Sequence, residues 1–273
     1  MSDAARANPG EAQIAAFEAE GADVRALLAQ LSDADWHRTT GFKDWTVWDV
    51  LAHLHFTDHM GLTTIAGPQA FNALMQDIAE AKMPIAAYTR RWLGDINGAE
   101  LTERWEELLA KLITGLRNAD PDVRLTWPGP GMKPRMFATA RQMETWAHAT
   151  EIYDLLELPR NHSDRIENIA TIGARTYGWT FTNRKLSVPE PVPYVRLTAP
   201  SGAIWEWNEP REDEAVVGEA VAFCQVVTQV RNVADTTLNV TGVNANDWMA
   251  IAQCFAGAPA DPPAPGSRGP TSA

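Results

Sequence analysis

The spacing of apolar residues over the first 158 residues is the feature that most constrains the fold. In residues 11–31 the apolar side chains recur at steps of three and four, at Ile14, Phe17, Val24, Leu27, Leu28 and Leu31. Residues 99–116 show the same spacing at Leu101, Trp105, Leu108, Leu109 and Leu112. Such steps gather apolar side chains on one face of a helix. Several long helices with mostly short connections predict an antiparallel bundle, whose core is a usual place for a metal site.

Capping residues and helix breakers set the expected ends of the other helices. Thr46 and Asp49 predict the start of a helix over residues 47–65. Thr46 can cap the helix, and the Asp49 carboxylate suits its first turn. A third helix is expected within residues 68–93. Residues 118–135, after the helix over 99–116, are rich in Pro and Gly, which excludes a helix there. The last helix of the bundle is expected to cover residues 141–158.

The pattern changes after Pro159, where short alternating segments mix with helical ones. Alternation around Pro200-Ser201-Gly202 is typical of a hairpin. In chain order the sequence predicts a helix over 164–186, a hairpin over 194–209, a helix over 214–230, a short strand within 236–242 and a closing helix over 245–255. These elements predict a second domain that mixes helices with a small sheet.

Together these patterns predict an α+β protein. We expect a helical bundle over residues 1–158, a smaller α+β domain over residues 159–258 and a disordered tail over residues 259–273. The tail prediction follows from its composition, which is rich in Pro and Gly and too poor in apolar residues to fold.

Charge and cysteine content exclude several classes of function. The formal net charge is −12 and no basic face is evident, which argues against a nucleic-acid partner. No signal peptide and no run of about 18 apolar residues occurs, so we expect a cytoplasmic protein without a membrane partner. Cys224 and Cys254 are not a metal-binding CxxC pair. No motif for a nucleotide or for a nucleophilic serine occurs. We expect a monomer or homodimer that acts on a small molecule.

Glu144 and His148 lie four residues apart in the last helix of the bundle, so they share one helix face. They can form a simple hydrogen-bonded pair or two arms of a metal site. A catalytic zinc takes three protein ligands of nitrogen and oxygen type and keeps one position open. Spacing alone allows either His53, or His55 together with His59, to complete the set from the second helix.

Three further residues near this pair have alternative interpretations. Glu151 shares the stripe of Glu144 and His148, so it is a rival third ligand or an acceptor behind them. Arg141 can orient the Glu144 carboxylate, attract an anionic substrate, or form a plain surface pair. Trp127, in the loop before this helix, can cover the open coordination position or belong to an ordinary connection.

Two segments that lie far apart in the sequence together resemble a known family. "WTVWDVLAHLHFTDH" and, some ninety residues later, "METWAHATEIYD" are similar to the DinB-like metal-binding four-helix bundle of the mycothiol-dependent maleylpyruvate isomerase superfamily. The resemblance implies that His53, Glu144 and His148 are the metal ligands. His55 and His59 do not match ligand positions and keep a structural interpretation.

The second domain resembles the same superfamily. The segments "YVRLTAPSGAIWEWNE", "GEAVAFCQVVTQVRNVADTTLNVTG" and "ANDWMAIAQCFAG" are similar to the strand-helix-strand unit that follows the bundle there. That unit carries a late arginine that helps to bind an anionic substrate or thiol, and the matching position is Arg231. The resemblance covers residues 10–258 and is greatest to an actinobacterial branch of metal-binding proteins.

The resemblance also implies a function. We expect a divalent metal, with Zn²⁺ as the expected ion, mycothiol as cosubstrate, and transfer to or isomerisation of a small electrophile, with Arg231 as the catalytic residue. The metal would bind the thiol sulfur and lower its pKa, since the thiolate is the form that attacks carbon. The alternatives are a thiol-independent lyase, cyclase or hydrolase on the same fold, and a metal-binding protein without catalytic activity.

Overall fold

The chain folds into two compact units, Met1–Ile152 and Tyr153–Ala273. The computed structural model describes residues 9–129 and 131–268. The first unit is helical and the second contains a small sheet, which confirms the predicted α+β fold. The division falls inside a helix, six residues before the predicted domain boundary at residue 158. Each unit is therefore described by itself.

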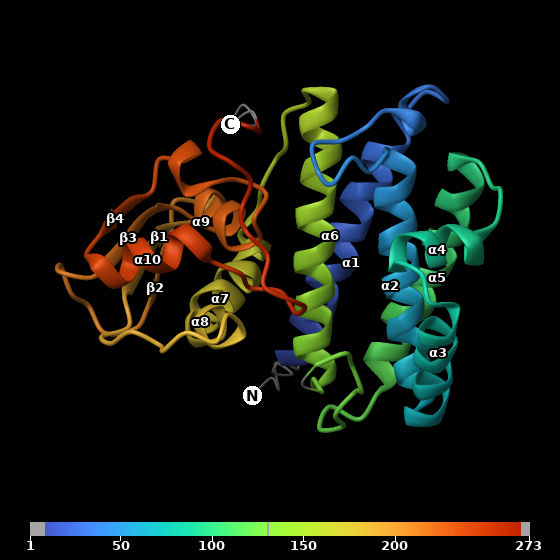
Figure 1. The fold of residues 1–273 in the computed structure, drawn as a ribbon, viewed down its shortest axis with the longest axis horizontal. Coiled ribbons are helices and arrows are strands. Elements are labelled where there is room, and N and C mark those ends of the chain that lie inside the picture. Colours follow the sequence, from blue (N-terminus) through green and yellow to red (C-terminus); the bar gives the residue numbers. More distant parts are fainter. Residues whose placement is uncertain (1–8, 130, 269–273) are drawn as a thin grey trace, which may run out of the picture. The chain divides into compact units, whose positions relative to one another are not determined.

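Four long helices build the bundle of the first unit (Figure 1). They are α1 (Pro9–Leu28), α2 (Val47–Ala66), α5 (Gly98–Asn118) and α6 (Pro134–Leu156). Their largest fully buried side chains include Phe17, Trp105, Phe137 and Trp146. No helix in the described part of the chain is long and apolar enough to cross a membrane.

The start of α2 is fixed by the predicted Thr46 cap, which the structure shows to be half of a capping box with Asp49. The Thr46 hydroxyl accepts a hydrogen bond from the backbone N–H of Asp49 at 3.2 Å, and the Asp49 carboxylate accepts one from the N–H of Thr46 at 3.0 Å. Two N–H groups that the first turn would otherwise leave without a partner are thereby satisfied. This cap sets where α2 begins and hence which way its side chains point.

The single helix predicted within residues 68–93 is two helices, α3 (Pro68–Ala81) and α4 (Ile85–Leu93). Lys82 has the left-handed backbone conformation that ends α3, with φ 48°. Pro84 disfavours the helical conformation in the residue before it, so the chain turns before α4 begins. The break lets α4 contact α2.

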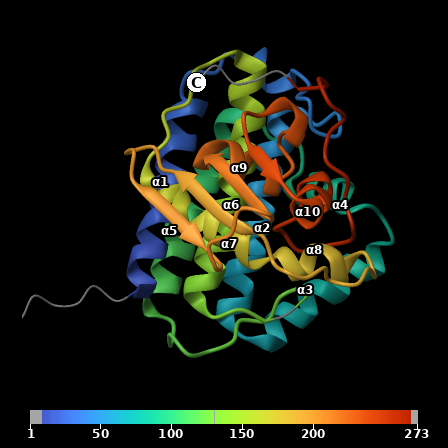
Figure 2. The ribbon, with the colours of Figure 1, turned by 90° about the vertical axis from the view of Figure 1, so that its left-hand side faces the viewer.

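A four-stranded sheet with the order β2-β1-β3-β4 forms the centre of the second unit. Figure 2 turns its strands toward the viewer. The strands are β1 (Tyr194–Thr198), β2 (Ile204–Trp207), β3 (Ala215–Glu219) and β4 (Asn239–Thr241). The remaining helices of the unit are α7 (Glu167–Arg175), α8 (Tyr177–Asn183), α9 (Ala220–Val227) and α10 (Val243–Ile251). The antiparallel β1–β2 hairpin, β4 and the closing helix confirm the predictions.

Two of the helices predicted for this unit are wrong in part. The segment 164–186 contains α7 and α8, separated at Thr176, whose hydroxyl donates to the Ile172 carbonyl at 2.8 Å. The segment 214–230 begins with the strand β3, which pairs in parallel with β1. Its Val216 and Val217 suit a strand, and the partner strand decides between the two conformations.

The prediction of a disordered tail is wrong for residues 259–268. The Gln229 side chain donates a hydrogen bond to the Ala260 carbonyl at 2.7 Å, and that of Asn232 donates to the Pro263 carbonyl at 2.9 Å. The N–H of Gly266 donates to Asp235 at 2.8 Å. Side chains of the folded unit thus satisfy the backbone of a segment with few apolar residues. Residues 269–273 lie outside the described residues.

Candidate metal centre

Three side chains from two helices of the bundle converge on one point. His53 comes from α2, and Glu144 and His148 come from α6, one helical turn apart. One ligand atom of each lies within 4.8 Å of the ligand atoms of the other two. Within the described residues these three form a group able to hold a metal ion. The structure therefore brings together the three residues that the family resemblance names.

The distances within the group fit a metal ion better than a set of hydrogen bonds. Nε2 of His53 and Nε2 of His148 each lie 3.5 Å from Oε2 of Glu144. Ligands about 2.0–2.2 Å from a tetrahedral zinc would stand about 3.4 Å from one another. Nε2 of His53 is buried and has no hydrogen-bond partner, although buried polar atoms are normally paired. The donor set and its spacing fit a divalent ion.

The local electrostatics hold His53 and Glu144 in the protonation states that a cation requires. Burial, aided by the nearby His148, lowers the pKa of His53 to about 4. Burial alone would raise the pKa of Glu144, but its interactions with His148 and His53 outweigh this and hold the pKa well below its ordinary value. At neutral pH His53 is neutral and Glu144 is ionised, and both are thus able to donate electron pairs to a metal.

An aromatic loop before α2 packs against the two histidine rings. Trp45 stacks on His148 with ring centroids 5.8 Å apart and lies 5.2 Å from the ring of His53. Phe42 meets His148 edge to face at 5.1 Å. The loop is closed by the Thr40 N–H, which donates to the Trp45 carbonyl at 2.8 Å. These contacts restrict the rotation of both imidazoles.

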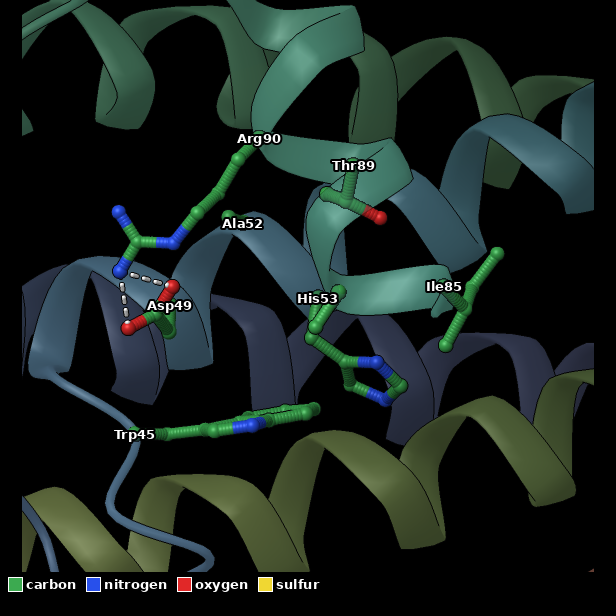
Figure 3. A pocket seen from close by; sticks show the side chains of 8 residues that line it. Trp45, Asp49, Ala52, His53, Ile85, Thr89 and Arg90 are labelled. Atoms are coloured by element: carbon green, nitrogen blue, oxygen red, sulfur yellow. Dashed lines mark hydrogen bonds and ion pairs between the residues drawn. The ribbon is translucent and has the colours of Figure 1, made fainter. Parts of the chain in front are cut away.

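A small pocket lies beside His53, between α2 and α4 (Figure 3). It is lined by Trp45, Asp49, Ala52, His53, Ile85, Ala86, Thr89 and Arg90. Arg90 from α4 makes an ion pair with Asp49 of α2 at 2.5 Å, drawn with dashed lines in Figure 3. His53 therefore borders this pocket as well as the metal group, and the pocket volume of about 10 Å³ is that of a site for about one water molecule.

The other residues considered for the site lie outside the metal group. The rings of His55 and His59 pack against Trp92, with centroids 5.5 and 4.7 Å apart. Glu151 is buried but does not belong to the metal group. Trp127 packs on the apolar cluster around Phe71. These positions favour the structural interpretation of the two histidines and of Trp127.

Comparison with known proteins gives the family. The family model described as the mycothiol maleylpyruvate isomerase N-terminal domain matches residues 3–153, more than half of the chain. The chain belongs to this family. Two uncharacterized proteins from two strains of Mycobacterium tuberculosis are 34% identical to it over 253 residues, which cover 93% of this chain and 98% of each relative.

Solved structures of the mycothiol maleylpyruvate isomerase family share the fold. The crystal structure of the mycothiol-dependent maleylpyruvate isomerase aligns with a TM-score of 0.52 and 16% identity, covering 80% of this chain and 88% of that one. A mutant of that enzyme aligns with the same TM-score. Since the match extends over most of both chains, it includes the second unit as well as the bundle.

In this member of the mycothiol maleylpyruvate isomerase family, Arg231 is a buried ion-paired residue of the second unit. Its side chain is 1% exposed, and Nη2 lies 2.6 Å from the Asp154 carboxylate. Nη1 donates to the carbonyl of Val230 at 2.8 Å, whereas Nε is buried without a hydrogen-bond partner. A role toward a substrate therefore requires a guanidinium N–H that these two contacts leave over, or an exchange of the Asp154 contact.

The burial of His55 predicts a pH dependence of stability. Burial, together with His59 and Arg104, lowers the pKa of His55 from 6.5 to about 4. As pH falls below 6.5, the unfolded chain gains a proton that the folded protein does not accept until about pH 4. Stability is therefore lost as pH falls through this window, by about 1 to 2 kcal/mol between pH 7 and pH 5.

The His55→Phe variant isolates this contribution, because phenylalanine keeps the ring against Trp92 and cannot titrate. In protein stripped of metal, urea unfolding at pH 7 and pH 5 should show a smaller loss of stability for the variant than for the wild type. His53 and His162, whose pKa values are also lowered to about 4, add to the loss in both proteins. Equal losses in the two proteins would contradict the assignment.

Proposed function

We propose that the protein is a divalent-metal-dependent enzyme that uses mycothiol to transfer to, or isomerise, a small electrophile. The metal group of His53, Glu144 and His148 carries this proposal. The family membership supports mycothiol as the cosubstrate, because the family model is that of a mycothiol maleylpyruvate isomerase domain. Zinc is the proposed metal, since two imidazoles and one carboxylate with a position left open are typical of catalytic zinc.

The proposed chemistry needs an activated sulfur and a fixed orientation. A zinc ion held by the three ligands would bind the thiol sulfur and lower its pKa, so that sulfur reacts as a thiolate at neutral pH. His53 and His148 keep their orientation because Trp45 packs on both rings. Arg231 is the proposed partner of a carboxylate on the substrate or the thiol, through charge-assisted hydrogen bonds.

One observation favours an enzyme over a metal-binding protein without catalytic activity. The metal group offers three protein ligands within the described residues, not four, whereas closed structural zinc sites use four. A lyase, cyclase or hydrolase that needs no thiol would fit the same geometry, so dependence on thiol separates the two candidate functions.

The proposal predicts that purified protein contains about one equivalent of zinc, and that it converts maleylpyruvate only when mycothiol is present. Metal analysis combined with a titration by mycothiol measures both. Treatment with a chelator should abolish conversion, and added zinc should restore it. Conversion at an equal rate without mycothiol would favour the thiol-independent alternative. Absence of a bound divalent metal would contradict the proposal as a whole.

A further inference from the structure

A buried ion pair ties together the two helices that carry the metal ligands. Nε of Arg141, on α6, donates to Oδ1 of Asp58, on α2, at 2.9 Å. The indole N–H of Trp105, on α5, donates to the other Asp58 oxygen at 3.0 Å. The side chains of Arg141 and Asp58 are 3% and 0% exposed. Three of the four bundle helices therefore meet at one carboxylate.

Stability alone does not explain this arrangement. Removing two charges from water often costs more free energy than their mutual attraction returns. Apolar replacements of similar volume are therefore frequently neutral or stabilising. The network is also incompletely satisfied, because Nη2 of Arg141 and the hydroxyl of Thr145, one turn further along α6, are buried without hydrogen-bond partners. A polar network of this kind calls for another explanation.

The position of the pair suggests that explanation. Asp58 lies five residues after His53 on α2, and Arg141 lies three residues before Glu144 on α6. On both helices the pair is therefore about one turn from the ligands. Beyond it the ring of Phe137 of α6 packs directly against α2, because a Cβ added to Gly61 of α2 would lie 2.9 Å from that ring.

We propose that the Asp58–Arg141 pair is a positioning device that sets the register of α2 against α6, and with it the geometry of the metal centre. The inference rests on the proposed function only in that the three ligands hold a metal. One ligand comes from α2 and two come from α6. A slip of one residue moves a ligand about 1.5 Å along its helix, whereas metal–ligand distances tolerate about 0.2 Å.

The Asp58→Leu/Arg141→Met double variant tests this proposal, since it replaces the pair with apolar side chains. Zinc affinity, measured by competition with a chelating dye, is expected to fall about 10–100-fold. Resistance to urea should fall only by the cost of the Trp105 indole N–H left without its acceptor, and affinity is compared under conditions in which both proteins are folded. The visible spectrum of the cobalt-substituted protein should also change. Wild-type zinc affinity and an unchanged cobalt spectrum in the double variant would overturn the proposal.

Two more variants complete the design. Arg141→Lys keeps the charge but loses the rigid fork of donors, so it should weaken zinc binding less than the double variant does. If the double variant does not fold, wild-type affinity in Arg141→Lys overturns the proposal. Leu116→Ala, a buried change on α5 about three turns beyond Trp105, should lower stability and leave zinc affinity unchanged; an equal loss of affinity there would also overturn the proposal.

The design separates this inference from the proposed function. A wild-type protein that binds no zinc would contradict the metal-dependent function itself. A wild-type protein that binds zinc, with a double variant that binds it equally well, would contradict the positioning role alone.

Discussion

Replacing His53 with alanine is expected to weaken zinc binding by more than about 100-fold, because changes to residues that merely support a ligand already cost about 10–100-fold. Among the described residues His53 is the one proposed ligand from α2, and its Nε2 atom is buried without a hydrogen-bond partner. His148→Ala should have an effect of similar size. Metal content after dialysis and competition with a chelating dye measure the loss.

His162→Ala is the matched control for these variants. His162 is also a histidine with a lowered pKa of about 4, but it belongs to the second unit and not to the metal group. The control should keep full metal content. Full occupancy in His53→Ala would contradict the assignment of ligands and would direct attention to His55 and His59.

Replacing Arg231 with methionine is expected to lower turnover about 100-fold. This is the lower end of the range for removing one donor that stabilises developing charge in an active site. Metal content should not change, because Arg231 is not a ligand in the proposal. Steady-state kinetics with mycothiol, together with metal analysis of the same preparation, measure the two quantities. Loss of metal along with activity would indicate a disrupted fold and would contradict the assigned role.

Asp154→Asn is the matched control for Arg231. The Arg231 guanidinium lies 2.6 Å from the Asp154 carboxylate. If this contact is its main purpose, loss of the Asp154 charge should reduce activity as much as loss of Arg231. If Arg231 instead binds a substrate carboxylate, Asp154→Asn should retain most of the activity.

The sequence allowed the bundle and the residues of the metal group to be predicted, for different physical reasons. Apolar spacing and the Thr46 cap are local properties, and the structure confirms α2 and this cap. The spacing of Glu144 and His148 puts both on one face of α6 by helical geometry alone. The choice of His53 over His55 and His59 came from the family resemblance, because spacing within α2 does not show which face meets α6.

The remaining features depend on contacts between segments that are distant in the sequence. The strand β3 was predicted as helix, and its parallel pairing with β1 decides its conformation. Asp58 and Arg141 lie 83 positions apart, so their pairing follows from the packing of two helices. Phe42 and Trp45 cover the histidines through a loop of no regular pattern, although its place directly before the matched helix was a usable signal.

The most direct test of thiol binding at the proposed metal centre is the absorption of the cobalt-substituted protein during titration with mycothiol. Cobalt accepts the same nitrogen, oxygen and sulfur ligands as zinc. If the metal at His53, Glu144 and His148 binds the thiol, an intense sulfur-to-cobalt charge-transfer band should appear, accompanied by release of a proton. The corresponding alcohol should produce no such band. An unchanged spectrum at saturating mycothiol, with cobalt still bound, would contradict thiol activation at this metal centre.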